Sequence, residues 1–240
     1  MRNLIYILLL LLIFSCDDTL FNEGDIITKE IITDDFDQIY VEDIFDIYLI
    51  QDTVCSIKAK GGSNLLPNLT FKVNDDKILS IDNNNSARWS RSYDKIELYI
   101  SVDTLWFLRL NAPSKVISVD TLVTPELKIF SITDFAEYDI NLDCDNCYIV
   151  NTATSGGIVN LSGSAITFSF RARGSFKINA EDFISDHVTV TSETIGDCSI
   201  FATRSIEAEV LRSGYVYYKG TPETITYIND KAKQQLIKTD

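Results

Sequence analysis

The chain repeats one short phrase five times: YDINL at Tyr138–Leu142, GIVNL at Gly157–Leu161, FKINA at Phe176–Ala180, CSIFA at Cys198–Ala202 and VYYKG at Val216–Gly220. The copies follow one another at steps of 19, 19, 22 and 18 residues. A repeat of about 20 residues that carries strands is typical of a solenoid, in which each unit buries its apolar face only against its neighbours. This stretch therefore predicts stacked rungs.

The repeat also predicts which side chains point into the solenoid. Successive residues of a strand face opposite sides, so equivalent positions of stacked rungs form columns. A second predicted strand in each rung supplies Cys147, Ile166, Val188 and Ile206 to the interior. Between two of the inward columns, Asn141, Asn160 and Asn179 form an outward ladder. The three inward columns are Tyr138, Gly157, Phe176, Cys198, Val216; Ile140, Val159, Ile178, Ile200, Tyr218; and Leu142, Leu161, Ala180, Ala202, Gly220.

Two strands per rung and the absence of a helical period predict an all-β fold, a parallel β-helix with about 20 residues per rung. A β-sandwich with regular hairpins fits the same turn spacing and remains an alternative. No Pro/Gly/Ser-rich linker divides the chain, so we expect one domain over residues 28–228. Residues 229–240 are polar, and we expect them to form a loose tail.

The N-terminus predicts export and a membrane anchor. An apolar run from Leu4 to Phe14 is too short to span a bilayer but suits a signal peptide, which we place at residues 1–15. Ile13–Cys16 resembles a bacterial lipobox, which implies lipidation of Cys16 and a tether over residues 16–27. An ordinary signal peptide cut elsewhere is the alternative. Asp17 and Asp18 resemble surface-export signals of Bacteroidetes lipoproteins.

Four segments resemble one known family. They are Phe36–Val41, Phe45–Gln51, Lys95–Ile100 and Ser213–Pro222. Together they resemble the auto-transporter adhesin family with a head GIN domain, whose members are lipoproteins and secreted proteins common in Bacteroidetes. The resemblance implies a right-handed, pectin-lyase-like β-helix, a role in adhesion, and no catalytic residues that could be transferred to this chain.

Catalysis would require convergent acids and bases on one face. The candidates are acidic residues near one edge and arginines in neighbouring rungs, and such charges on a solenoid are more often a solvated face of ion pairs. The single histidine, His187, removes His-based triads and His-rich metal sites. We therefore predict no enzyme, no cofactor and no metal site, although a calcium site at Asp143 and Asp145 is conceivable. The candidate catalytic residues are Asp134, Asp139, Asp143, Asp145, Arg171, Arg173, Arg204 and Arg212.

The cysteines are interpreted mainly as small core residues. Cys144 and Cys147 have Cys-x-x-Cys spacing, but no βαβ pattern or second pair accompanies them. Cys147 and Cys198 fall in inward columns, where a thiol packs as a small apolar group. A disulfide between Cys144 and Cys147 remains open in an oxidising envelope.

Charge and exposed aromatics narrow the possible partners. The net charge of −14 argues against nucleic acid, which requires basic patches. Tyr215 and Tyr217 have outward phase near the C-terminal end, and Trp89 and Tyr93 lie in a polar loop. These four residues are the candidate ligand-binding positions for a glycan or protein, since aromatic side chains offer apolar area with a polar rim. Capping of the last rung is the alternative role for the two tyrosines.

The sequence thus predicts a lipid-anchored outer-membrane protein, exposed at the cell surface, that mediates adhesion or another interaction without catalysis. Its partners are the membrane through Cys16 and a glycan or protein. Two alternatives remain: a polysaccharide lyase or hydrolase on the same scaffold, and a periplasm-facing structural or envelope-stress component.

Overall fold

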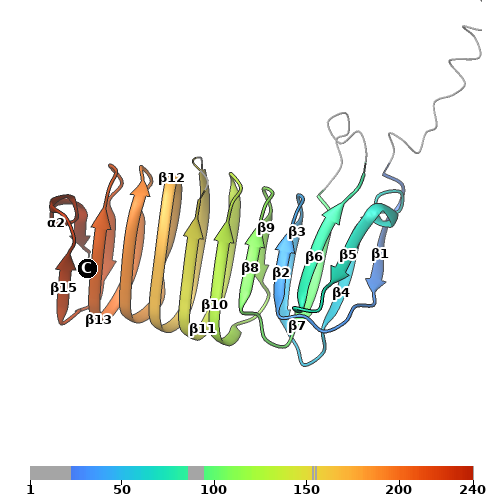
Figure 1. Ribbon diagram of the computed structural model, residues 1–240, viewed down its shortest axis with the longest axis horizontal. Coiled ribbons are helices and arrows are strands. Elements are labelled where there is room, and N and C mark those ends of the chain that lie inside the picture. Colours follow the sequence, from blue (N-terminus) through green and yellow to red (C-terminus); the bar gives the residue numbers. More distant parts are fainter. Residues whose placement is uncertain (1–22, 86–94, 153, 155, 240) are drawn as a thin grey trace, which may run out of the picture.

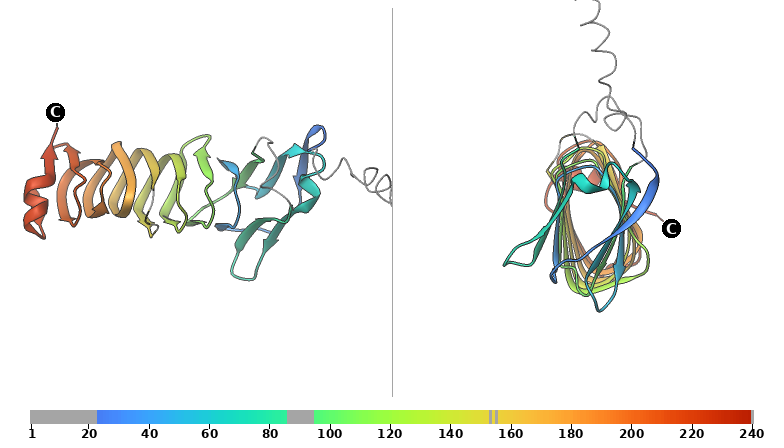
Figure 2. Two further views of the ribbon diagram at one scale, coloured as in Figure 1. Left: turned by 90° about the horizontal axis from the view of Figure 1, so that it is seen from above. Right: turned by 90° about the vertical axis from the view of Figure 1, so that its right-hand side faces the viewer.

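A computed structural model describes residues 23–85, 95–152, 154 and 156–239. The described chain is a β-solenoid of about 6 turns, roughly 21 residues apart, as the repeat predicted. The rungs lie side by side along the long axis, from β1 (Ile26–Ile31) at one end to α2 (Asp230–Gln235) at the other (Figure 1). Seen along that axis, the rungs superimpose as a flattened oval (Figure 2).

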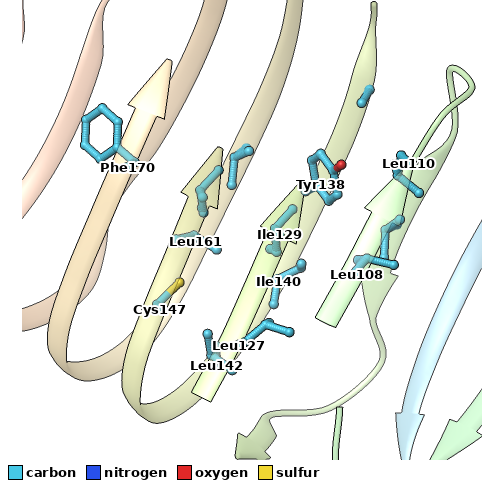
Figure 3. Packing of buried hydrophobic residues seen from close by; sticks show 14 of the residues in the cluster. Leu108, Leu110, Leu127, Ile129, Tyr138, Ile140, Leu142, Cys147, Leu161 and Phe170 are labelled. Carbon is cyan, nitrogen blue, oxygen red and sulfur yellow. The ribbon is translucent and has the colours of Figure 1, made fainter. Parts of the chain in front are cut away.

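Alternation of side chains explains why these residues form strands. In β11 (Ala136–Asn151) the residues from 136 to 144 alternate strictly between buried and exposed. One face of each strand therefore packs inside the oval while the other meets water. The interior is aliphatic and aromatic: Leu127 is paired with Cys147 of the neighbouring strand, and Ile129 and Ile140 lie in the same core (Figure 3).

Strand pairing in the C-terminal half follows chain order and is parallel throughout. Each of the first three strands pairs with the next along the chain, and the fourth pairs with both of the strands that follow it. The long strands bend around the corners of the oval, so that one strand serves both flat faces. Parallel pairing excludes the β-sandwich alternative. The strands are β10 (Leu122–Ser131), β11, β12 (Gly156–Thr194), β13 (Cys198–Val210), β14 (Val216–Lys219) and β15 (Thr224–Tyr227).

The register of the repeat differs from the predicted one at two of four steps. Ala136, not Tyr138, pairs with Gly157, and Ile178, not Phe176, pairs with Cys198. The steps are therefore 21, 19, 20 and 18 residues. Each error is two residues, which is one strand period, so the predicted inward residues keep their face. Gly157 shows why register matters: a Cβ there would lie 2.3 Å from a ring carbon of Phe176.

One of the inward residues predicted for the second strand of each rung is wrong. Cys147 pairs with Phe168, whereas Ile166 lies at a corner with 50% of its surface exposed. Val188 pairs with Ile206 as predicted. A corner between Ala165 and Phe168 shifts the alternation, and a strict period of two cannot anticipate such a shift.

The outward ladder also changes its members. Asn179 Nδ2 donates to Asn160 Oδ1 at 2.9 Å, as stacked neighbours do. Asn141, however, pairs with Ser162, and Asp139 pairs with Asn160. The ladder is thus Asp139, Asn160 and Asn179.

The N-terminal half stacks its rungs out of chain order. On one face the spatial order is β6, β2, β8, β10, and on the other it is β7, β3, β9, β11, all in parallel. The rung made of β2 and β3 therefore lies between the rung made of β6 and β7 and the rung made of β8 and β9. Both of these rungs come later in the chain. These strands are β2 (Gln38–Val41), β3 (Asp46–Gln51), β6 (Ile78–Asn83), β7 (Glu97–Val102), β8 (Phe107–Leu110) and β9 (Lys115–Ser118).

Antiparallel strands close the N-terminal end. β4 (Ser56–Gly62) pairs with β1 and β7, and β5 (Leu69–Val73) pairs with β6. The short 3₁₀ helix η2 (Leu66–Asn68) joins β4 to β5. The β5–β6 hairpin projects sideways from the oval (Figure 2). Antiparallel pairing ends the parallel stack, as the terminal unit of a solenoid must.

The C-terminal segment is not the loose tail that its polar composition predicted. Residues 230–235 form α2, and β16 (Leu236–Lys238) adds a parallel strand to β14. Asn229 begins the helix, because its Oδ1 accepts the N–H of Ala232 at 2.9 Å. Ala232 is fully buried and Leu236 is 6% exposed, so two apolar contacts in a polar segment are enough to cap the last rung.

Candidate functional site

The structure brings Tyr215 and Tyr217 together, as their shared phase predicted. Their ring centroids are 6.1 Å apart with planes inclined by 23°, and Tyr215 is 43% exposed. Both point outward because Val216 between them is fully buried. The backbone N–H of Tyr215 donates to Asp197 Oδ1 at 2.9 Å, which fixes the strand where it enters the last rung. This pair is a partly exposed aromatic surface near the C-terminal end.

Three other predicted positions lie outside the described residues. They are Trp89 and Tyr93, the other candidate ligand-binding residues, and Cys16, the predicted lipidation site.

A larger group of aromatic side chains lies on the opposite flat face, and we call it the aromatic patch. It comes from strands that are neighbours in space, β2, β8, β10 and β11, with one tryptophan immediately before β8. All five side chains are partly buried, and Tyr40, Phe107, Phe130 and Tyr148 occupy strand positions that alternate with buried residues and therefore face outward. The aromatic patch is Tyr40, Trp106, Phe107, Phe130 and Tyr148.

The rings of the aromatic patch touch one another from strand to strand. The centroid of Phe107 is 5.5 Å from Tyr40, 5.2 Å from Phe130 and 5.6 Å from Trp106. Phe107 and Phe130 are stacked, with planes inclined by 24°, whereas Trp106 meets Phe107 edge to face. Such pairs stabilise a sheet by about 0.5–1.5 kcal/mol each beyond the area they bury.

Two cations lie among these rings. Arg109 Cζ is 5.3 Å from the Tyr40 centroid. Lys128 Nζ is 5.6 Å from the Trp106 centroid and 5.7 Å from that of Tyr148. Aromatic faces attract cations at these distances.

Polar groups surround the aromatic patch. The indole Nε1 of Trp106 donates to Asp37 Oδ1 at 3.1 Å, and Lys128 Nζ lies 2.7 Å from Glu126 Oε1. Arg109 Nε donates to Asn111 Oδ1 at 2.9 Å, and Asn111 in turn donates to Glu42. The surface thus combines apolar rings with a rim of charged and amide groups.

The aromatic patch was not predicted from the sequence, although a signal for it existed. Tyr40 stands between Ile39 and Val41, and Tyr148 between Cys147 and Ile149, so both aromatics alternate with core residues. That alternation assigns the rings to the outer face. Their proximity could not be seen, because β2 and β8 are far apart in the chain and stack out of chain order.

Three of the four candidate arginines form surface ion pairs, and among the candidate aspartates Asp143 accepts a hydrogen bond from the Ser164 hydroxyl at 2.8 Å. Arg171 and Arg173 both contact Glu193, at 2.6 and 3.3 Å, and Arg204 lies 3.3 Å from Asp186. Such pairs contribute little stability each at exposed positions. Within the described ranges, no group of three or more His, Cys, Asp or Glu residues is placed to hold a metal ion.

The buried thiols are free and poorly ionisable. Cys144, Cys147 and Cys198 are buried and unpaired by disulfides. Burial raises the pKa of the Cys144 and Cys198 thiols to about 12, and nearby carboxylates (Asp143 and Asp145, and Asp197, respectively) act in the same direction. Burial likewise raises the pKa of Cys147 well above its ordinary value. Thiols that stay protonated are weak nucleophiles, so these side chains act as core residues.

Helices contribute little to the molecule. In the described part of the chain, no helix combines the length and the apolar character needed to cross a membrane.

The parallel stack of rungs places the chain in the class of β-solenoid proteins. Residues 35–222 match the family described as putative auto-transporter adhesin, head GIN domain, and the chain belongs to this family. The resemblance found in the sequence is thereby confirmed. No curated protein matches the chain.

Solved structures with the same fold come from Bacteroides and Parabacteroides. A putative adhesin from Bacteroides fragilis superimposes with a TM-score of 0.77 at 23% identity, covering 90% of this chain and 95% of its own. A putative adhesin from Parabacteroides distasonis gives 0.62 at 18% identity over 90% and 95% of the two chains. A putative lipid binding protein from the same organism gives 0.65 at 19% identity over 90% and 98%. Similarities at this identity establish the fold, and the family supports an adhesion-type role at the cell surface or envelope.

Proposed function

We propose that the protein is a lipid-anchored adhesion or interaction module of the outer membrane, exposed at the cell surface and without catalysis. The observation that carries this proposal is the match of residues 35–222 to the adhesin family. An elongated, densely packed solenoid suits such a role, because it presents surfaces at a distance from its point of attachment.

The position of β1 supports attachment by one end. β1 lies at the extreme of the solenoid opposite α2 (Figure 1). A lipid on Cys16, seven residues before the first described residue, would attach this end to the membrane. The Tyr215–Tyr217 pair lies toward the other end, where it would contact a glycan or protein outside the cell. Stable anchoring takes more than one acyl chain, which a bacterial lipoprotein cysteine carries.

The charged groups support a role without catalysis. The arginines named above are held by Glu193 and Asp186, and His187 Nδ1 lies 2.8 Å from the hydroxyl of Ser205 on the exposed surface. In each of these pairs the two side chains contact one another on an exposed face of the solenoid. An acid and a base that converge on one position would be needed for hydrolysis or elimination.

Lipidation is tested by growing cells with a labelled fatty acid. The native protein is expected to carry the label and fractionate with the outer membrane, whereas Cys16→Ala should lose both properties. A Cys55→Ala variant is the matched control, because Cys55 lies in the solenoid and should not affect labelling. Equal labelling of the native protein and Cys16→Ala would contradict the anchor.

Surface exposure is tested by adding protease to intact cells. The protein should be degraded while a periplasmic marker stays intact. Protection of the protein in intact cells, followed by degradation once the outer membrane is opened, would place it on the periplasmic side instead.

A further inference from the structure

The rings of the aromatic patch lie at outward-facing positions that are polar in some adjacent strands. Its neighbours on the same outward columns are polar: Ser80 pairs with Tyr40, and Ser169 pairs with Tyr148. The fold therefore accepts small polar side chains at these positions. Aromatic rings that keep part of their surface in solvent, gathered on one face, mark interaction sites.

The spacing of the rings suits an extended ligand. One ring comes from each of four neighbouring strands, Tyr40 of β2, Phe107 of β8, Phe130 of β10 and Tyr148 of β11. Neighbouring strands lie about 4.8 Å apart. A ligand that contacts all four rings must run across the strands, along the long axis of the solenoid, and must offer an apolar face at short regular intervals.

The charges around the rings favour an uncharged ligand. Lys128 lies 2.7 Å from Glu126, and the side chains of Asp37 and Glu42 stand at the rim. The positive charges are thus balanced locally, and the whole chain carries a net charge of −14. A polyanion would be repelled by this field, which extends over about a Debye length, ~8 Å at physiological salt.

The same charges disfavour a dry protein interface. Burying Lys128, Glu126 and Arg109 beneath a protein partner would remove their water, and the cost of desolvating charges can exceed the gain from pairing them. A carbohydrate leaves the rim wet, since its hydroxyls form hydrogen bonds with carboxylates, amides and bridging water. Its ring carbons meanwhile present a flat apolar face to aromatic side chains.

We propose that the aromatic patch binds a neutral polysaccharide, whose sugar rings pack on the aromatic side chains and whose hydroxyls bond the polar rim. Trp106 and Tyr148, at two edges of the group, supply the largest contacts. This inference rests on the proposed adhesive function and deepens it by naming the class of ligand and a surface separate from the Tyr215–Tyr217 pair.

Electrophoresis of the purified full-length protein through gels that contain polysaccharide tests the proposal. The gels contain mannan, galactomannan, arabinoxylan or a mixed-linkage β-glucan, with polygalacturonate and heparin as anionic counterparts. We expect slower migration in at least one neutral gel, and Trp106→Ala or Tyr148→Ala should weaken that binding at least tenfold. Tyr48→Ala is the matched control: Tyr48 stacks on Tyr99 at 4.7 Å on the opposite face, so its loss should leave migration unchanged.

Three outcomes would overturn the proposal. They are unaltered migration in every neutral gel, retardation by the anionic gels alone, and retardation that Trp106→Ala and Tyr148→Ala leave intact. A Tyr215→Ala variant identifies binding by the other aromatic surface, which would also count against the aromatic patch.

A second measurement leaves the aromatic patch intact. The chain has two tryptophans, so Trp89→Phe leaves Trp106 as the sole indole. Titration with oligosaccharides cut from the retained polysaccharide should shift the emission of Trp106 saturably, and an unchanged spectrum would contradict the proposal. Protease digestion of intact cells gives an independent result. Display without glycan binding would refute this inference alone, and glycan binding without display would refute the surface role alone.

Discussion

The two halves of the solenoid share one cross-section but differ in the order in which their rungs stack: chain order in the C-terminal half, and a different order in the N-terminal half. In the C-terminal half, contacts such as Asn179 to Asn160 join residues 19 apart. In the N-terminal half, the N–H of Phe45 donates to Ser114 Oγ, 69 residues away, because the rung of β2 and β3 is enclosed by rungs made later in the chain. Contacts between distant residues cost more loop-closure entropy before they stabilise the fold. We therefore expect the C-terminal half to form first and the N-terminal half to close onto it.

The largest expected effect comes from the core of the C-terminal half. Phe168 is fully buried and contacts the rings of Phe170 and Phe183, both at 5.4 Å. Phe168→Ala should lower the free energy of unfolding by about 3–5 kcal/mol, because it removes buried area and leaves a cavity. Urea denaturation followed by circular dichroism measures this loss.

The control for this prediction lies on the outer face. Phe130→Ala removes the same side chain from a partly exposed position and should cost about 1 kcal/mol, from its ring contact with Phe107. Equal losses for Phe168 and Phe130 would mean that the inward and outward faces had been assigned wrongly.

Leu79→Ala tests the same contrast in the N-terminal half. Leu79 is fully buried in β6 and pairs with Ile39 of the enclosed rung. The substitution should cost about 2–4 kcal/mol locally. In a solenoid each rung contacts only its neighbours, so hydrogen exchange should accelerate in β6 and in its partners β2 and β5, and remain slow in β13. Acceleration in β13 would show that the two halves unfold as one unit.

Much of the fold could be predicted from the sequence because apolar residues recur in it with a regular period. The phrase ending in Leu142, Leu161 and Ala180 has the period of a strand, and this period determines which residues face inward. Register could not be read from it, since a slip of two residues keeps every side chain on its face, as happened at Tyr138 and Phe176. The lengths of the corners, which set the register, carry no such pattern.

The candidate site was less predictable for a related reason. The Tyr215–Tyr217 pair was visible because two residues of one strand share a face. The aromatic patch joins residues from four strands, and its members could be grouped only with the spatial order of β2, β8 and β10 known. Pairing between residues so distant leaves no local signal in a single sequence. The cap at Asn229 was missed because only Ala232 and Leu236 of that polar segment are buried.

Gly157→Ala tests the stacking of neighbouring rungs, and its expected effect is intermediate. Its Cβ would lie 2.3 Å from a Phe176 ring carbon and 2.9 Å from the Ala136 carbonyl oxygen, so the core must shift. Overpacking of this kind costs about 1–3 kcal/mol. The melting temperature should fall accordingly.

The adjacent glycine is the matched control. At Gly156 a Cβ would approach the Ser175 hydroxyl no closer than 3.3 Å, and that hydroxyl can rotate away. Gly156→Ala should therefore be nearly neutral. The opposite ranking of the two substitutions would contradict the stacking of Gly157 on Phe176.

The smallest effect is expected from the thiols, which again differ between the halves. Cys55 in the N-terminal half is partly exposed, whereas Cys144, Cys147 and Cys198 in the C-terminal half are buried. In a Cys16→Ser background at pH 8, iodoacetamide should modify Cys55 first and the other three only on unfolding. Mass spectrometry after timed quenching gives the order. Early labelling of Cys198 would indicate that the C-terminal rungs open more readily than the N-terminal ones.

The raised pKa values also predict how stability changes with pH. Burial raises the pKa of Cys144 and Cys198 from 9.0 to about 12, so the folded state keeps these protons at a pH where the unfolded chain has lost them. Stability should therefore be independent of these thiols below pH 9 and fall as the pH rises from 9 toward 12. Cys198→Ala should reduce the slope of this fall in urea denaturation between pH 9 and 10.5, while Cys55→Ala leaves it unchanged. An identical slope in both variants would show that ionisation of the Cys198 thiol does not limit stability in alkali. Ionisation of other groups would then account for the loss of stability.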